Sequence, residues 1–269
     1  MSTTARASSR RIFAMVLRHT YLMRKSWIRI VETAYWPTMN MILWGFLAKY
    51  LATQSSALAQ VPGLLISALL LWELLFRGQL NLALAFLEEL YARNLANLFV
   101  SPLRPWEFLS SMVVVSLIRT TIGVGAAALL AWILYAHSVF DMGFALIAFF
   151  INLLATGWGI GLMVCALIMR FGLAAENFAW GLIFVLAPVS GVYYPIDVLP
   201  GWLQAFAWTL PTSHIFEGMR ASLQERVMRW DLLMNAVMLN VVYFVVGVAL
   251  FLRSFTGARQ CGALLQTGE

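Results

Sequence analysis

Long runs of apolar residues alternate with short polar and basic segments along this chain. At about 1.5 Å per helical residue, a helix needs roughly 20 mainly apolar residues to cross about 30 Å of hydrocarbon. Several stretches of the sequence meet that length with few ionisable side chains. The pattern predicts membrane-crossing helices over five windows, namely residues 33–51, 63–87, 109–135, 142–169 and 232–252.

A sixth apolar window is shorter and runs into prolines. Residues 178–192 would reach only roughly 22 Å as a helix. Four prolines occur from position 188 to position 211, and proline lacks the N–H that a continuous helix needs. Because lipid leaves broken backbone without hydrogen-bond partners, such a segment survives only inside protein or along a wet cavity. We therefore expect a short helix and then a re-entrant pair within 198–218, with residues 193–218 forming an outer segment at a pathway or gate.

The segment before the first window mixes apolar and basic residues. Seven Arg and Lys residues are spread over positions 1–31, which is typical of a helix lying in the lipid headgroup layer. The segment lacks the short charged start, apolar core and cleavage site of a secretory signal, so no cleaved signal is predicted. The pattern thus predicts an all-α integral membrane protein with six transmembrane helices. We divide it into an N-terminal interfacial amphipathic helix (1–31), a transmembrane domain (32–254) with a re-entrant helical segment before the last span, and a tail (255–269).

Basic residues are distributed unevenly between the two predicted sides of the membrane. With six crossings, the N-terminal segment shares a side with residues 88–108, 170–176 and 253–269, and these four segments carry most of the Arg and Lys residues. Since basic loops stay in the cytoplasm, both termini are predicted to be cytoplasmic. The net charge of +6 therefore reflects topology. We expect no nucleic acid partner, because no compact basic patch with interleaved aromatic residues is present.

Composition excludes several other classes of protein. With 62% hydrophobic and 11% charged residues, the chain has too much apolar surface for a soluble globule of this length, so the lipid bilayer is an expected partner. Cys165 and Cys261 form no disulfide framework. His19 and His137 have no partners at ligand spacing. We expect no metal site and no cofactor bound by this chain.

Glu73, Arg77 and Arg119 lie well inside predicted spans, where charge is costly and is a default sign of function. Glu73 and Arg77 are four residues apart, so they share a helix face and are predicted to neutralise each other. Arg119 has no local partner. It must face the bundle, extend toward the membrane surface, or meet Glu73 or another acid across a helix interface, and a role in binding a substrate headgroup also stays open. An anionic substrate would be favoured if Arg77 and Arg119 faced one cavity.

Aromatic residues fall into two groups. Most tryptophans lie near predicted span ends, as in the aromatic belts of membrane proteins. Four rings belong instead to the broken outer segment, where they are placed to line an exit, stack on a sugar or contact an acyl chain. These four are Tyr193, Tyr194, Trp202 and Trp208.

The loop between the second and third windows, residues 88–107, reads EELYARNLANLFVSPLRPWE. Its first part has leucines on roughly one helical face, and Pro102 and Pro105 end the helix before the next span. On periodicity alone, a solvated polar loop and a short rigid strut that docks on a partner are equally supported.

Two stretches of the sequence resemble a known family. The loop sequence NLFVSPLRPWEFL and the segment PVSGVYYPIDVLPGWLQAFAWTLPTSHIFEGMR are similar to permease subunits of ABC-2 type exporters, including the branch with drug-resistance and nodulation-factor exporters. The resemblance spans nearly the whole chain and is most specific at residues 94–109 and 188–220. It implies a homodimer bound to two copies of an ABC ATPase subunit in the bacterial cytoplasmic (inner) membrane.

The resemblance also implies roles for individual residues. In the family the 88–107 loop is a coupling helix that docks in a groove of the ATPase, and the N-terminal helix is an elbow that also touches a partner subunit. The positions carried over for coupling are Glu88, Glu89, Arg93, Asn94, Ser101, Pro102, Leu103 and Arg104.

A pathway follows from the same resemblance. Spans one, two and five line the dimer interface in the family, and residues 192–218 would form the outer gate. The candidate pathway residues on those spans are Tyr35, Asn40, Trp44, Glu73, Arg77 and Asn177, beside Arg119 and the four rings of the outer segment.

The implied activity is ATP-driven export of a hydrophobic, lipid-linked or glycan-like substrate. The chain has no G-x-x-x-x-G-K-[ST] phosphate loop, so it is not expected to be an enzyme, and ATP and Mg would bind the partner ATPase. A stand-alone carrier or channel is an alternative, although the broken segment has no counterpart in the first half, as inverted repeats would require. Ser190 and His214 also resemble the catalytic residues of a rhomboid-like serine protease. This alternative is remote, because Pro188 replaces a motif glycine and His214 is expected in an extramembrane or re-entrant loop, not on a late span that faces the serine.

Overall fold

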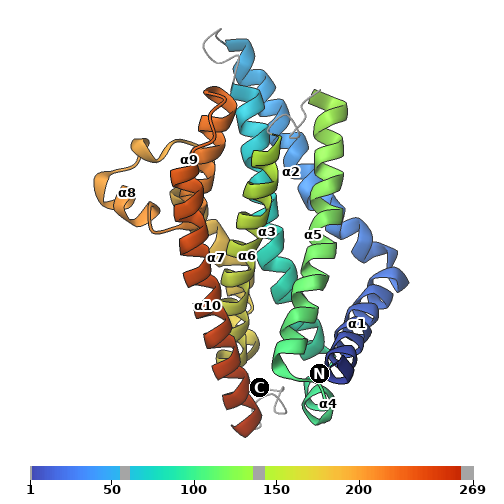
Figure 1. The fold of residues 1–269 in the computed structure, drawn as a ribbon. Coiled ribbons are helices and arrows are strands. Elements are labelled where there is room, and N and C mark those ends of the chain that lie inside the picture. Colours follow the sequence, from blue (N-terminus) through green and yellow to red (C-terminus); the bar gives the residue numbers. More distant parts are fainter. Residues whose placement is uncertain (1, 55–60, 136–142, 262–269) are drawn as a thin grey trace.

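The computed structural model describes residues 2–54, 61–135 and 143–261, and all regular secondary structure in these ranges is helical. The predicted all-α fold is therefore confirmed for the described chain (Figure 1). Position 142 of the fourth predicted window, His137 and positions 262–269 of the predicted tail lie outside the described residues.

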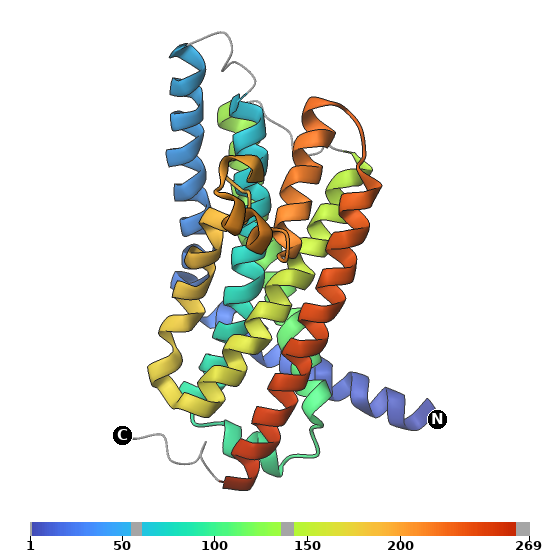
Figure 2. The same ribbon diagram turned by 90° about the vertical axis from the view of Figure 1, so that its left-hand side faces the viewer.

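The N-terminal segment forms α1 (Ser2–Lys25), which crosses the end of the bundle at a steep angle (Figure 2). A break at Ser26 separates it from α2 (Trp27–Gln54). The predicted boundary at residue 31 is therefore wrong by a few residues, because 27–31 already belong to the next helix. Pro37 lies inside α2.

Four helices of the described chain are long and apolar enough to cross a membrane by length and composition. They are α3 (Val61–Tyr91), α5 (Pro105–Tyr135), α6 (Phe144–Phe171) and α10 (Trp230–Cys261). They correspond to the second to fifth predicted windows. The first predicted window lies within α2, which has the same 28 residues as α6 but contains polar and aromatic residues that lower its hydropathy.

The proline-rich region is a series of short elements. A 10-residue helix, α7 (Asn177–Leu186), is followed by single 3-10 turns at Ala187–Val189 and Ile196–Val198. Next come α8 (Gly201–Ala207), which projects from the side of the bundle (Figure 1), and α9 (Pro211–Gln224). The apolar helix expected over 178–192 is thus shorter than predicted. Helix α9 packs against α6 and α10.

Helix α3 is the centre of the bundle. Within its most apolar window 89% of residues are buried, compared with 72% for α6, 39% for α5 and 22% for α10. Glycines allow the close approach of α6 to its neighbours. A Cβ at Gly157 would lie 2.7 Å from the Leu75 carbonyl oxygen of α3, and a Cβ at Gly247 of α10 would lie 2.6 Å from the Gly159 carbonyl oxygen.

The segments that the sequence assigns to one side of the membrane do lie at one end of the bundle. Helix α1, the short helix α4 (Leu95–Val100), the turn at Gly172–Ala175 and the C-terminal end of α10 are all found there (Figures 1 and 2). We call this the α4 end of the bundle.

Candidate functional site

Two cavities lie next to each other along α3, where α2 and α7 flank it. The first has a volume of about 200 Å³ and the second about 230 Å³. We call the first the arginine cavity; its charged and aromatic lining residues are Arg29, Glu32, Trp36, Arg77, Glu88, Arg119 and Trp180. We call the second the aromatic cavity; it is lined by Asn40, Met41, Trp44, Leu69, Trp72, Glu73, Phe76, Phe184 and Tyr193.

The aromatic cavity brings together residues that are far apart in the sequence. The rings of Trp44 and Tyr193 stack with their centroids 5.4 Å apart, which joins α2 to the outer segment. Asn40 Nδ2 donates a 2.8 Å hydrogen bond to Glu73 Oε1. Four of the predicted pathway residues therefore meet in this cavity.

A buried ion pair separates the two cavities. Arg77 Nε donates to Glu73 Oε2 at 3.2 Å, so the pair predicted from the four-residue spacing is present. The Arg77 guanidinium carbon lies 5.6 Å from the centroid of the Phe76 ring. Arg77 Nη2 is buried and has no hydrogen-bond partner among the described residues. Glu73 lines the aromatic cavity and Arg77 lines the arginine cavity, so the pair is the boundary between them.

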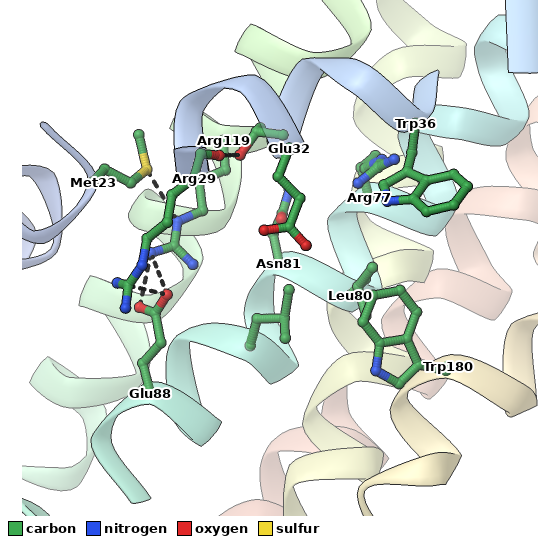
Figure 3. Close-up of a pocket in the computed structure, with 12 residues that line it drawn as sticks. Met23, Arg29, Glu32, Trp36, Arg77, Leu80, Asn81, Glu88, Arg119 and Trp180 are labelled. Carbon is green, nitrogen blue, oxygen red and sulfur yellow. Dashed lines mark hydrogen bonds and ion pairs between the residues drawn. The ribbon is translucent and has the colours of Figure 1, made fainter. Parts of the chain in front are cut away.

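The arginine cavity carries charge at both of its ends (Figure 3). Arg77 lies beside Trp36 at one end, and Arg119 meets Glu88 at the other. Arg119 Nη2 lies 3.0 and 2.8 Å from the two carboxylate oxygens of Glu88, and Arg119 Nε lies 3.2 Å from the sulfur of Met23. The acid that neutralises Arg119 is therefore Glu88, 31 residues away.

Glu88 and its neighbour Glu89 connect α3 to α1. The buried ring of His19 lies between them, with Nδ1 3.2 Å from Glu88 Oε2 and Nε2 3.3 Å from Glu89 Oε1. Arg18 Nη2 lies 3.2 Å from Glu89 Oε2, and Asn94 Nδ2 donates to the same oxygen at 2.7 Å. The sequence places both acids in the coupling loop, whereas the structure turns their carboxylates toward α1.

A second ion pair fixes α1 to the start of α5. Arg11 binds Glu107 with two hydrogen bonds, Nε to Oε2 at 2.8 Å and Nη2 to Oε1 at 2.6 Å, and Glu107 raises the pKa of Arg11. Glu107 also accepts the backbone N–H of Arg104 at 2.9 Å. Sequence reasoning missed His19 and Glu107, because their partners lie 69 and 96 residues away.

The 88–107 loop forms the surface of the α4 end. Leu95 is buried, which anchors α4 to the bundle, while Val100 is 91% exposed. Ser101 Oγ donates to the Leu98 carbonyl oxygen at 2.7 Å and closes the helix. Of the predicted coupling residues, Glu89 is fully buried, Asn94, Ser101 and Leu103 are partly buried, and Arg93, Pro102 and Arg104 are exposed.

The remaining predicted pathway residues lie outside both cavities. Tyr35 is exposed and packs edge-on against Trp36, and Asn177 is exposed at the start of α7. In the outer segment the Tyr194 hydroxyl donates to the Pro188 carbonyl oxygen at 2.7 Å, Trp202 is 74% exposed, and Trp208 packs against the ring of His214.

The serine and histidine of the protease alternative have other partners. Ser190 Oγ donates to the Ala187 carbonyl oxygen at 2.8 Å, and His214 Nε2 lies 3.0 Å from the Trp208 carbonyl oxygen. His214 is buried near the start of α9 and is not on a late membrane-length helix. Within the described chain no hydrogen bond joins Ser190 to His214, and the geometry gives no support to a catalytic pair.

Comparison with known proteins agrees with this architecture. Residues 13–223 match the family described as ABC-2 type transporter. The chain is also 37% identical over 84 residues to the capsule polysaccharide export inner-membrane protein BexB of Haemophilus influenzae, a match that covers 31% of this chain and 29% of BexB. The family match includes both cavities, the α4 loop and the whole outer segment at residues 193–218. This chain, with its apolar membrane-length helices, therefore belongs to the ABC-2 type transporter family.

Proposed function

We propose that this chain is the membrane-spanning permease subunit of an ABC exporter. It moves a lipid-linked or glycan-like substrate out of the cytoplasm or the inner leaflet, and a separate ATPase subunit binds ATP and Mg and supplies the energy. The observation that carries this proposal is the pair of polar and aromatic cavities along α3, in the middle of an apolar bundle.

Ionisable side chains that are buried inside an apolar bundle require an explanation, because their burial is costly. Glu73, Arg77 and Arg119 are each no more than 5% exposed, and ionisable residues inside membrane helices mark substrate pathways by default. Rings from α2, α3 and α7 line the same cavities and offer flat surfaces for sugars or acyl chains. BexB is named for capsule polysaccharide export, which supports a substrate that contains a glycan.

Coupling to the ATPase is assigned to the exposed part of the 88–107 loop. Pro102 and Arg104 are exposed at the α4 end, and Asn94 links the loop to Glu89 at the last turn of α3. Closure of an ATPase dimer against this loop would therefore push directly on the helix that lines both cavities. The contacts of Glu88 and Glu89 with α1 would carry the same displacement to the N-terminal helix.

The membrane arrangement and the second copy follow from this function. We assign α2 as the first of six crossings, and α7 with the broken segment after it as the fifth, with both termini cytoplasmic. Exposed apolar and aromatic side chains cover the outer faces of α2 and α7, among them Leu43, Phe46, Phe184 and Val185. A second copy of the chain at this face would enclose the cavities, and residues 193–218 would form the outer gate.

Reconstitution with an ATPase subunit tests the proposal. The full chain is co-expressed with a candidate ABC ATPase, and co-purification and ATPase rate are compared for wild type, Arg104→Glu and Pro102→Ala. Lys49→Glu, which also reverses an exposed charge but lies near the far end of α2, is the matched control.

We expect Arg104→Glu to abolish co-purification or to lower the ATPase rate at least tenfold, a smaller loss for Pro102→Ala, and no change for Lys49→Glu. If no ATPase co-purifies and the purified chain alone transports substrate, the chain is a stand-alone carrier and the proposal is wrong.

A further inference from the structure

We propose that the arginine cavity binds the anionic headgroup of an amphiphilic molecule, and that Arg77 is the main residue that holds this headgroup. The inference rests on the proposed function in one respect, since it names the headgroup chemistry of the exported substrate. The binding itself requires no ATPase and can be measured separately.

Arg77 has a hydrogen-bond donor without an acceptor among the described residues. Arg77 is 5% exposed, and a guanidinium carries five N–H donors. Arg77 Nε is satisfied by Glu73, but Nη2 is buried and has no acceptor among the described residues. Leaving a buried charged donor unpaired is unfavourable, and an oxygen of an anionic ligand in the cavity would satisfy it.

Basic and acidic side chains both line the arginine cavity. The guanidinium groups of Arg29, Arg77 and Arg119 line the cavity together with the carboxylates of Glu32 and Glu88. Glu88 is already shared by Arg119, His19 and, at 3.7 Å, Arg29. Arg29 and Glu32 both lie on the exposed part of the lining. The buried guanidinium groups of Arg77 and Arg119 outnumber Glu88, the one carboxylate besides Glu32 that lines the cavity, and guanidinium groups bind phosphate, sulfate or carboxylate in a bidentate way.

Two tryptophan rings lie where the part of the ligand beyond its headgroup would leave the cavity. Trp36 from α2 and Trp180 from α7 line the cavity on the side of Arg77 (Figure 3), and they are 53% and 40% exposed. Their rings offer apolar surface next to the charged site. A volume of about 200 Å³ holds a headgroup but no complete lipid, so an attached chain or sugar would leave past these two rings.

The neighbouring cavity does not offer the same chemistry. Its buried ionisable group is the acceptor Glu73, which already accepts Asn40 and Arg77. An anion would be repelled there. An anion bound to Arg77 would also compete with Glu73 for the guanidinium and would weaken the ion pair that separates the two cavities.

Binding of a simple amphiphile tests the inference. The purified full chain in phosphatidylcholine nanodiscs is titrated with decyl phosphate, and tryptophan fluorescence is followed, with empty nanodiscs as the background. Decyl maltoside tests the need for charge, and inorganic phosphate tests the need for the chain. Trp180→Phe shows how much of the signal comes from the cavity.

We expect a saturable response to decyl phosphate, and an apparent Kd at least tenfold weaker in Arg77→Gln. Arg77→Lys should lie between the two, because it keeps the charge but loses the planar fork. Arg253→Gln, which removes an exposed arginine of α10 outside the cavity, should bind as wild type does. Glu73→Gln should bind decyl phosphate more tightly than wild type, because it releases Arg77.

Arg77→Gln leaves the buried Glu73 without its partner, which disfavours folding of this variant. A second variant without an unpaired charge therefore tests the same point. Glu73→Gln with Arg77→Gln removes both charges and should also lose the response. An unchanged Kd in a folded double variant, or an equal Arg77-dependent response to decyl maltoside, overturns the proposal.

Inorganic phosphate separates the two sources of anion. An equal Arg77-dependent response to it would support the anion site but overturn the assignment to an amphiphile. If the wild-type chain binds decyl phosphate through Arg77 but does not couple to an ATPase, the proposed function alone is refuted. If it couples to an ATPase but does not bind decyl phosphate through Arg77, this inference alone is refuted.

Discussion

The arginine cavity and the aromatic cavity lie one helical turn apart on α3, yet they are built from different chemistry. One ends against a cluster of charges that reaches α1, and the other ends against the stacked rings of Trp44 and Tyr193. Within the Glu73–Arg77 pair, Arg77 lines the arginine cavity and Glu73 lines the aromatic cavity. A single buried ion pair can thus divide a pathway into a part that attracts anions and a part that favours rings and chains.

The largest expected effect comes from breaking the boundary between the cavities. Glu73→Leu leaves the buried Arg77 charge uncompensated, which should destabilise the protein by about 3–5 kcal/mol. Glu73→Leu with Arg77→Leu should cost less, because no buried charge remains. Thermal unfolding of detergent-purified variants measures both. A double variant that is less stable than Glu73→Leu would show that the pair matters for more than charge balance.

The next effect concerns the far wall of the arginine cavity. Glu88→Gln keeps the shape of the side chain but removes the charge that neutralises Arg119, and should destabilise the protein by about 1.5–3 kcal/mol. It should also tighten decyl phosphate binding, because more guanidinium charge is left free. The melting temperature and the Kd for decyl phosphate are measured on the same preparation. Arg253→Gln, a substitution at an exposed position of α10 outside the cavity, is the control and should change neither.

Sequence reasoning succeeded here where the contact is local. The Glu73–Arg77 pair follows from a four-residue spacing, which any helix would place on one face. The partner of Arg119 could not be named, because Glu88 lies on a different helix and belongs to a loop that looks solvent-exposed in the sequence. In the sequence His19 has no partners at ligand spacing, and only the docking of α1 brings it between Glu88 and Glu89.

For the fold, too, features that depend on local sequence were predictable and features that depend on tertiary packing were not. Apolar windows gave α3, α5, α6 and α10 directly, since their hydropathy depends on composition alone. The lengths of α7 and α9 were not predictable, because tertiary packing decides where a proline-rich chain is helical. Pro211 begins α9, as a proline in a first turn can, and the helix continues past the expected limit at residue 218 because its apolar face packs on α6 and α10.

A smaller effect is expected at the ring stack of the aromatic cavity. Trp44→Leu and Tyr193→Leu each remove one ring of the pair, and a double-mutant cycle should give a coupling of about 0.5–1.5 kcal/mol. Thermal unfolding of the four proteins supplies the cycle. The same cycle on Tyr35 and Trp36, whose exposed rings meet edge-on, should give a smaller coupling. Additive changes at Trp44 and Tyr193 would mean that the stack does not hold the outer segment to α2.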